Sequence, residues 1–149
     1  MCEVYTPEFK RIAVGVDGSA YSFKALEVAC RMAKLFNAEI VQAIHVVPTR
    51  LPYAASSALP EAHYLDFLRE MGKEALNCAE RIASKHEVSL EKVLLEGDPV
   101  EELAKHVQES RVDLLVLGRR GLGKESQPGV GSVSLAVASN VECSLLIVH

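Results

Sequence analysis

The chain has 149 residues, of which 49% are hydrophobic and 24% charged, with a formal net charge of −4 at pH 7. This length and composition are typical of one globular domain that buries its core without disulfide bonds, so we expect a single domain over residues 1–149. The acidic balance argues against nucleic acid and anionic membrane surfaces as partners, because both attract basic proteins. The sequence shows no signal-peptide pattern and no run near the ~20 apolar residues of a membrane span, so we expect a cytoplasmic protein.

Apolar runs and segments with helical periodicity alternate along the chain. The strands are expected at residues 12–16, 39–47, 90–96, 113–118 and 143–148. The helices are expected at residues 20–36, 61–86, 99–109 and 132–139. Because parallel neighbours need helical crossovers, this alternation predicts an α/β fold with a doubly wound, five-stranded parallel sheet.

Local signals add detail to several of these elements. The fourth and fifth strands are apolar on both faces, as expected for strands that helices cover on each side. The third strand holds Glu91, Lys92 and Glu96, charges that favour an edge position. Asp98 has the chemistry of an N-cap for the third helix. Residues 49–60 form a long irregular connection, for which a lid, a partner-contacting flap and plain disorder all stay open.

The cysteines and histidines show no metal-binding spacing. Cys30, Cys78 and Cys143 are expected to be small core residues, and Cys2 an exposed thiol. No Ser-His-Asp grouping can be argued from the residue order. The sequence therefore predicts neither a metal site nor a catalytic residue.

The position of a binding site follows from the predicted sheet. In an open α/β sheet, ligands bind beyond the carboxyl ends of the strands where the strand order changes direction, which places the site after the first and fourth strands. Asp17 follows the first strand; its carboxylate either meets a ribose, an adenine amine or a metal, or only forms an Asx turn. Gly118 ends the fourth strand, either as a plain turn residue or as a point where ribose or phosphate lies against the backbone.

A glycine-rich segment leads from the fourth strand to the last helix, which begins near Gly131 and Ser132. Absent Cβ atoms and unpaired N–H groups at a helix start suit phosphate, and the hydroxyls of Ser132 and Ser134 could add donors. The alternative is that Gly131 and Ser132 only cap the helix. Three basic residues near this segment are either phosphate ligands or solvated surface charge: Arg119, Arg120 and Lys124.

Together these motifs resemble the universal stress protein family over nearly the whole chain. The resemblance rests on RIAVGVDGS at residues 11–19 and on a loop of Gly, two residues, Gly, nine residues, Gly and Ser, which Gly118, Gly121, Gly131 and Ser132 match. It implies the strand order 3-2-1-4-5, ATP as the ligand with or without Mg²⁺, and a homodimer in which the last strands of two subunits pair. An apolar last strand at a sheet edge agrees with such pairing.

The resemblance also implies roles for individual residues. Asp17 and the backbone at Val46 would lie near adenine and ribose, and the glycine loop near ribose and phosphates. The predicted nucleotide-binding residues are Asp17, Val46, Gly118, Arg119, Gly121, Gly123, Gly131, Ser132, Val133 and Ser134. Glu125 and Pro128 are departures within the loop, one beside the expected phosphates and the other near the helix start.

The function that the resemblance implies is an ATP-binding stress-response or signalling module with little or no hydrolysis. Two alternatives stay open. One is a dimeric interaction protein of the same family that binds no nucleotide. The other is a slow ATPase, for which the sequence supplies cations near the phosphates but no evident base.

Overall fold

The computed structural model describes residues 2–4, 6–50 and 61–149. Within them the strands are β1 (Arg11–Gly15), β2 (Ile40–Pro48), β3 (Leu90–Gly97), β4 (Leu114–Gly118) and β5 (Ser144–Val148). The helices are α1 (Ala20–Phe36), α2 (Glu61–Lys85), α3 (Pro99–Glu109) and α4 (Ser132–Ala138). The predicted elements are confirmed, and their ends lie within one residue of the predicted ends.

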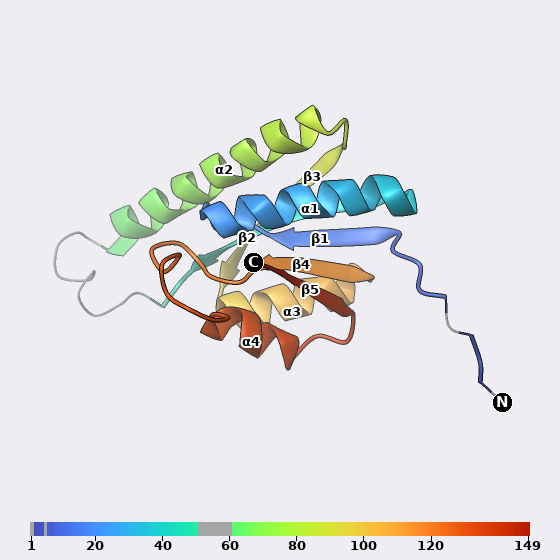
Figure 1. The fold of residues 1–149 in the computed structure, drawn as a ribbon. Helices are drawn as coiled ribbons and strands as arrows, with labels where there is room; N and C mark the ends of the chain where they lie inside the picture. Colours follow the sequence, from blue (N-terminus) through green and yellow to red (C-terminus); the bar gives the residue numbers. More distant parts are fainter. Residues whose placement is uncertain (1, 5, 51–60) are drawn as a thin grey trace.

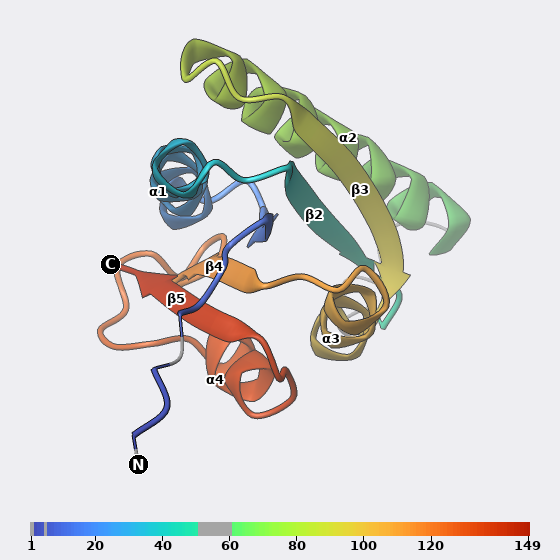
Figure 2. The same cartoon turned by 90° about the vertical axis from the view of Figure 1, so that its right-hand side faces the viewer.

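The strands form a parallel sheet in the order β3-β2-β1-β4-β5, which confirms the predicted α/β topology. α1 and α2 cover one face of the sheet, and α3 and α4 cover the other (Figure 1 and Figure 2). The charged strand β3 lies at an edge, as predicted. Among the described residues, no helix has both the length and the apolar character needed to cross a membrane.

Two hydrophobic cores fill the space between the sheet and its helices. Ile12 and Val14 of β1 belong to the core beneath α1 and α2, whereas Ala13 between them belongs to the core beneath α3 and α4. This alternation is the period of two that a strand imposes on its side chains. Because both faces are covered, β4 and the interior of β1 are apolar, whereas β2 carries Gln42 and His45, whose side chains have hydrogen-bond partners within the protein.

Helix caps fix where two crossovers begin. Ser19 accepts a hydrogen bond at Oγ from the Ser22 amide at 3.2 Å, which caps α1. The predicted N-cap of α3 is confirmed, because Asp98 Oδ1 accepts from the amides of Val100 and Glu101 at 3.0 Å each. Such side-chain acceptors replace the missing backbone partners of a helix start. Both caps follow the carboxyl ends of strands.

The cysteine prediction is only partly correct. Cys30 is fully buried, and burial raises the pKa of its thiol to about 11. Cys78 and Cys143 are half-buried instead of being core residues, while Cys2 is exposed as predicted. Of the connection predicted as a lid, flap or disordered segment, residues 51–60 lie outside the described residues.

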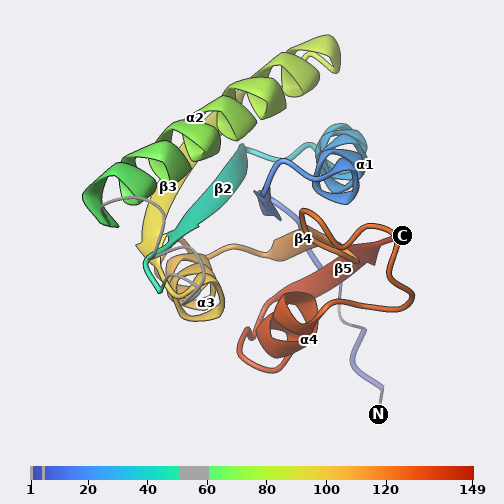
Figure 3. The ribbon, with the colours of Figure 1, turned by 90° about the vertical axis from the view of Figure 1, so that its left-hand side faces the viewer.

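Figure 3 looks toward the carboxyl ends of the strands. The turn after β1 and the loop after β4 meet at this end, and α2 begins beyond the ends of β2 and β3 (Figure 1 and Figure 3). The adjacency of β1 and β4 in the sheet brings these two connections together. This end is the switch point of the sheet, because the chain runs outward from β1 in both directions.

Candidate functional site

A cavity of about 650 Å³ lies at the carboxyl ends of the central strands. The turn after β1, the loop after β4 and one side of α2 form most of its wall, and residues of β2, α3 and α4 complete it. Val16, Ile44 and Leu117 contribute buried apolar surface at its base. The volume falls within the range of small-molecule sites.

Asp17 connects the turn after β1 with the loop after β4. Its Oδ1 accepts a hydrogen bond from the Ser19 amide at 2.9 Å, and its Oδ2 accepts one from the Leu122 amide at 3.0 Å. A Cβ atom at Gly121 would lie 2.8 Å from Oδ2, so glycine is what allows the loop to come this close. The Asx turn is therefore present, and the same carboxylate also bridges two distant parts of the chain.

Two arginine side chains hold the loop that follows β4. Nη1 of Arg119 donates to the carbonyls of Gln127 and Gly129 at 2.8 and 2.9 Å, and Nη2 donates to the Tyr21 hydroxyl at 2.7 Å. Arg120 donates from Nε to the Gly129 carbonyl at 3.2 Å and from Nη2 to the carbonyl of the proline before it. The guanidinium groups bind the protein's own backbone oxygens.

The small residues at the ends of this loop also make contacts within the protein. A Cβ at Gly118 would lie 2.7 Å from the carbonyl carbon of Tyr21, so close packing against α1 already requires glycine there. Ser134 donates from Oγ to the Gly118 carbonyl at 3.1 Å. The Gly131 amide donates to the Arg119 carbonyl at 2.6 Å. These groups shape the cavity whether or not they also contact a ligand.

The structure brings most of the predicted binding residues together. Those on the cavity wall are Asp17, Val46, Gly118, Gly121, Gly131, Ser132, Val133 and Ser134. Arg119 and Gly123 do not line it, which differs from the prediction. The Arg119 guanidinium instead donates to carbonyls of the loop. Gly123 has a φ of +80° and no atom near its Cβ position, which is typical of a glycine in a turn.

Helix α2 supplies a side of the cavity that the sequence prediction lacks. Its residues on the wall are Leu68, Met71, Glu74, Ala75 and Cys78. The sequence carried no signal for them, because Leu68 and Met71 continue the apolar side of α2 and only the structure shows that Met71 stays 42% exposed. A helix that extends past the sheet cannot bury these residues in the core, so they are available to a ligand site.

His45 also lies on the wall, although the sequence predicted no metal-binding or catalytic residue. Its Nδ1 lies 2.7 Å from the Val16 carbonyl oxygen. Because a carbonyl only accepts, Nδ1 carries the proton. A Cβ at Gly72 would lie 2.6 Å from Cδ2 of this ring, so α2 rests directly on it. The histidine therefore links β2, the end of β1 and α2 at the cavity.

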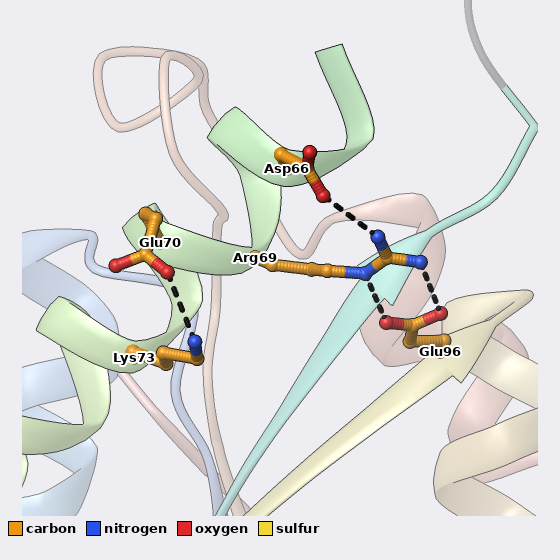
Figure 4. A network of polar contacts seen from close by, with 5 residues as sticks. All are labelled: Asp66, Arg69, Glu70, Lys73 and Glu96. Carbon is orange, nitrogen blue, oxygen red and sulfur yellow. Dashed lines mark hydrogen bonds and ion pairs between the residues drawn. The ribbon is translucent and has the colours of Figure 1, made fainter. Parts of the chain in front are cut away.

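An ion-pair network anchors the first half of α2 to the sheet. Arg69 donates from Nε to Oε1 of Glu96 at 2.5 Å and from Nη2 to Oε2 at 3.1 Å, a two-bond contact with the end of β3 (Figure 4). Its Nη1 also donates to Asp66 at 3.0 Å. The guanidinium lowers the pKa of the Glu96 carboxyl. This pairing holds the helix turns that carry Leu68 and Met71 over the cavity.

Charges of both signs surround the largely apolar cavity. The positive charges on the wall are those of Arg120 and Lys124 in the loop, and the negative charges are those of Asp17 and Glu74. Glu74 itself accepts a hydrogen bond from Arg81 at 3.2 Å. An apolar floor with cationic groups at one side suits a ligand that has a flat apolar part and an anionic part.

Comparison with known proteins shows the family. The profile of the universal stress protein family matches residues 8–149. Universal stress protein YxiE of Bacillus subtilis is 36% identical over 150 residues, covering 95% of this chain and 99% of its own length. Universal stress protein MJ0531 of Methanocaldococcus jannaschii is 33% identical over 141 residues, covering 94% and 82%. The chain belongs to the universal stress protein family.

Solved structures share the fold. UspA from Lactobacillus plantarum superposes with a TM-score of 0.84 at 21% identity, covering 97% of this chain and all of that one. A universal stress protein in complex with cAMP gives 0.71 at 26% identity, covering 95% and 98%. The Archaeoglobus fulgidus protein in complex with dAMP gives 0.68 at 22% identity, covering 99% and 100%.

The bridge made by Asp17 yields a first prediction. Asp17→Asn retains one acceptor for Ser19 but places an NH₂ group against the Leu122 amide, so one hydrogen bond is lost. We expect the free energy of unfolding to fall by about 1–2 kcal/mol and hydrogen exchange of the Leu122 amide to accelerate about tenfold. Urea unfolding and NMR exchange measure the two effects, with Glu109→Gln, an exposed carboxylate on α3, as the control. Unchanged exchange at Leu122 would contradict the bridge.

Proposed function

We propose that this chain binds an adenine nucleotide, ATP included, in the cavity at the carboxyl ends of β1 and β4. The single observation that carries the proposal is the cavity itself, which lies at the switch point and is bordered by Asp17, the glycine loop and the start of α4. The family relative in complex with cAMP and the fold neighbour in complex with dAMP support the ligand class. Adenine and ribose fit the apolar floor, and phosphates fit the loop with Arg120 and Lys124.

The carboxylates on the described wall are poorly suited to Mg²⁺. Both oxygens of Asp17 accept backbone amides, and Glu74 lies against Arg81. Magnesium prefers oxygen ligands with near-octahedral geometry, and in nucleotide sites it takes one or two carboxylates with the phosphates. We therefore propose that nucleotide binding here does not depend on the metal.

The proposed biological role is a stress-response or signalling module whose state depends on the bound nucleotide. A path for that dependence runs through the backbone: the Arg119 amide, which begins the loop, donates to the carbonyl of Val148 at the end of β5 at 2.9 Å. A ligand that moves the loop therefore acts on the edge strand. An edge strand is where another chain can pair.

Filling the cavity from α2 tests the binding proposal. Met71→Trp puts a larger side chain on the wall, at a position already 42% exposed, so the fold should persist. We expect the affinity for AMP and ATP to fall about tenfold, or about 1.4 kcal/mol, by isothermal titration calorimetry. Leu35→Trp, on an exposed site of α1 outside the cavity, is the control and should bind like the wild type.

The outcome for the wild type decides between the candidate functions. If neither AMP nor ATP binds at about 1 mM, a free energy near −4 kcal/mol, the nucleotide proposal fails. The dimeric interaction protein without nucleotide would then be the better description.

We expect bound ATP to be turned over poorly. Fast phosphoryl transfer needs a residue that orients the attacking water as well as cations around the phosphates. Asp17 is occupied by two amides, and Glu125 does not line the cavity. The rate of phosphate release should stay well below the ~1 s⁻¹ of ordinary enzymes, and Glu125→Gln should leave it unchanged. Release at several per second in the wild type, abolished in this variant, would make the protein an ATPase.

We also propose a homodimer through β5. β5 and β3 are the two edge strands of the described sheet. β3 carries charges that discourage pairing with another chain, whereas β5, with the sequence SLLIV, is apolar after its first residue. Sedimentation at about 50 µM should show a dimer. Ile147→Lys places a charge on the half-buried edge and should shift the equilibrium to monomer, whereas Leu35→Lys on α1 should not. A monomeric wild type at this concentration would refute the proposal.

A further inference from the structure

We propose that Arg119 and Tyr21 are positioning residues of the nucleotide site, which hold the loop of residues 121–130 without contacting the ligand. Their effect on binding depends on the nucleotide function proposed above. Neither residue lines the cavity, whereas the loop contributes Gly121, Leu122 and Lys124 to its wall. Arg119 would thus shape the cavity wall through the loop, without lining the wall itself.

The backbone of Arg119 is fixed at both of its polar groups. Its amide donates to the Val148 carbonyl at 2.9 Å, and its carbonyl accepts from the Gly131 amide at 2.6 Å. The first bond joins it to the end of β5, and the second joins it to the N-cap of α4. The Arg119 backbone is therefore held by both β5 and the start of α4, which limits where its side chain can lie.

The guanidinium group spans the gap between α1 and the far half of the loop. It reaches the carbonyls of Gln127 and Gly129 on one side and the Tyr21 hydroxyl on the other. Its central carbon also lies 4.6 Å from the centre of the Tyr21 ring. A planar fork with several donors can satisfy three acceptors at once, whereas the single ammonium of lysine cannot reproduce that geometry.

Tyr21 is itself held in place. It lies in the first turn of α1, and its backbone packs so closely against Gly118 that no Cβ fits between them. The hydroxyl that receives Arg119 is therefore fixed relative to β4. A continuous set of contacts runs from α1 through Tyr21 and Arg119 to the loop.

Arg120 also holds the far half of the loop, through the carbonyls of Pro128 and Gly129. Arg119 differs from it because it ties the loop to α1 through the Tyr21 hydroxyl. The near half of the loop is held by Asp17 at Leu122, and local turns join Lys124 to Gly121 and Gln127 to Lys124, each at 3.1 Å. Ordering a freed loop on binding costs conformational entropy for every residue that is fixed. Loss of the hydrogen bonds from the Arg119 guanidinium should thus weaken a ligand whose phosphate needs the loop, and should do so even where the positive charge is kept.

The test compares Arg119→Lys, Arg119→Ala and Tyr21→Phe with the wild type, using AMP and adenosine as ligands. We expect Arg119→Lys to weaken AMP about 3- to 10-fold even though the charge is kept, and to weaken adenosine less, because its base and ribose lie on the apolar floor. Tyr21→Phe should weaken AMP about 2-fold while the ring contact remains. Arg31→Lys, at an exposed position of α1, is the control and should change neither affinity.

A second readout needs no ligand. In the free protein, hydrogen exchange of the Gln127 and Gly131 amides should accelerate about 3- to 10-fold in Arg119→Ala, because the loop opens locally more often. Unchanged exchange would overturn the proposal. So would an AMP affinity that Arg119→Lys keeps at the wild-type value and Arg119→Ala loses, because the charge alone would then matter and Arg119 would be a phosphate ligand. If the wild type binds neither ligand, the nucleotide function fails, and the exchange measurement still decides whether these residues position the loop.

Discussion

The Asp17 carboxylate is the contact on which the geometry of the cavity depends. It joins the turn after β1 to Leu122, a residue 105 positions further along the chain. The parallel pairing of β1 with β4 makes this contact possible, because it brings the carboxyl ends of both strands to the same edge. The loop approaches the carboxylate only because Gly121 has no side chain to collide with Oδ2. The pairing of β1 with β4 and the missing Cβ of Gly121 together hold the loop of residues 121–130 against the end of the sheet.

The fold could be predicted from the sequence because its signals are local and repeat along the chain. Apolar runs such as LLVLG in β4, the capping chemistry of Asp98 and the charges of β3 each identify an element or its place without long-range information. The switch-point rule then predicted a site at Asp17 and Gly118, and both residues line the cavity. The strand order came from the family resemblance, and the sheet has that order.

The parts of the site that sequence could not foresee depend on three-dimensional contacts. Arg119 and Arg120 look alike in sequence, as two cations beside a glycine-rich loop, yet of the two only Arg120 lines the cavity. Which carbonyls a guanidinium meets depends on how the loop folds back, and residues eight to ten positions away supply those acceptors. The contribution of α2 to the cavity was missed for a related reason. How far a helix extends beyond its sheet depends on packing, and here it is visible only in the structure, where Met71 remains exposed.

Under the proposed function, the same contacts give a bound nucleotide a route to the edge strand. A ligand shifts an equilibrium only as far as it prefers one state over another. The loop lines the cavity at Lys124, and the bond from Arg119 to Val148 joins the start of the loop to the edge strand. Under the proposed function, a nucleotide that favours one loop arrangement would therefore favour one state of β5. By reciprocity, pairing at β5 would alter nucleotide affinity by the same factor. In this proposal the contacts of Arg119 carry the coupling, since an unrestrained loop would absorb the change without passing it to the sheet.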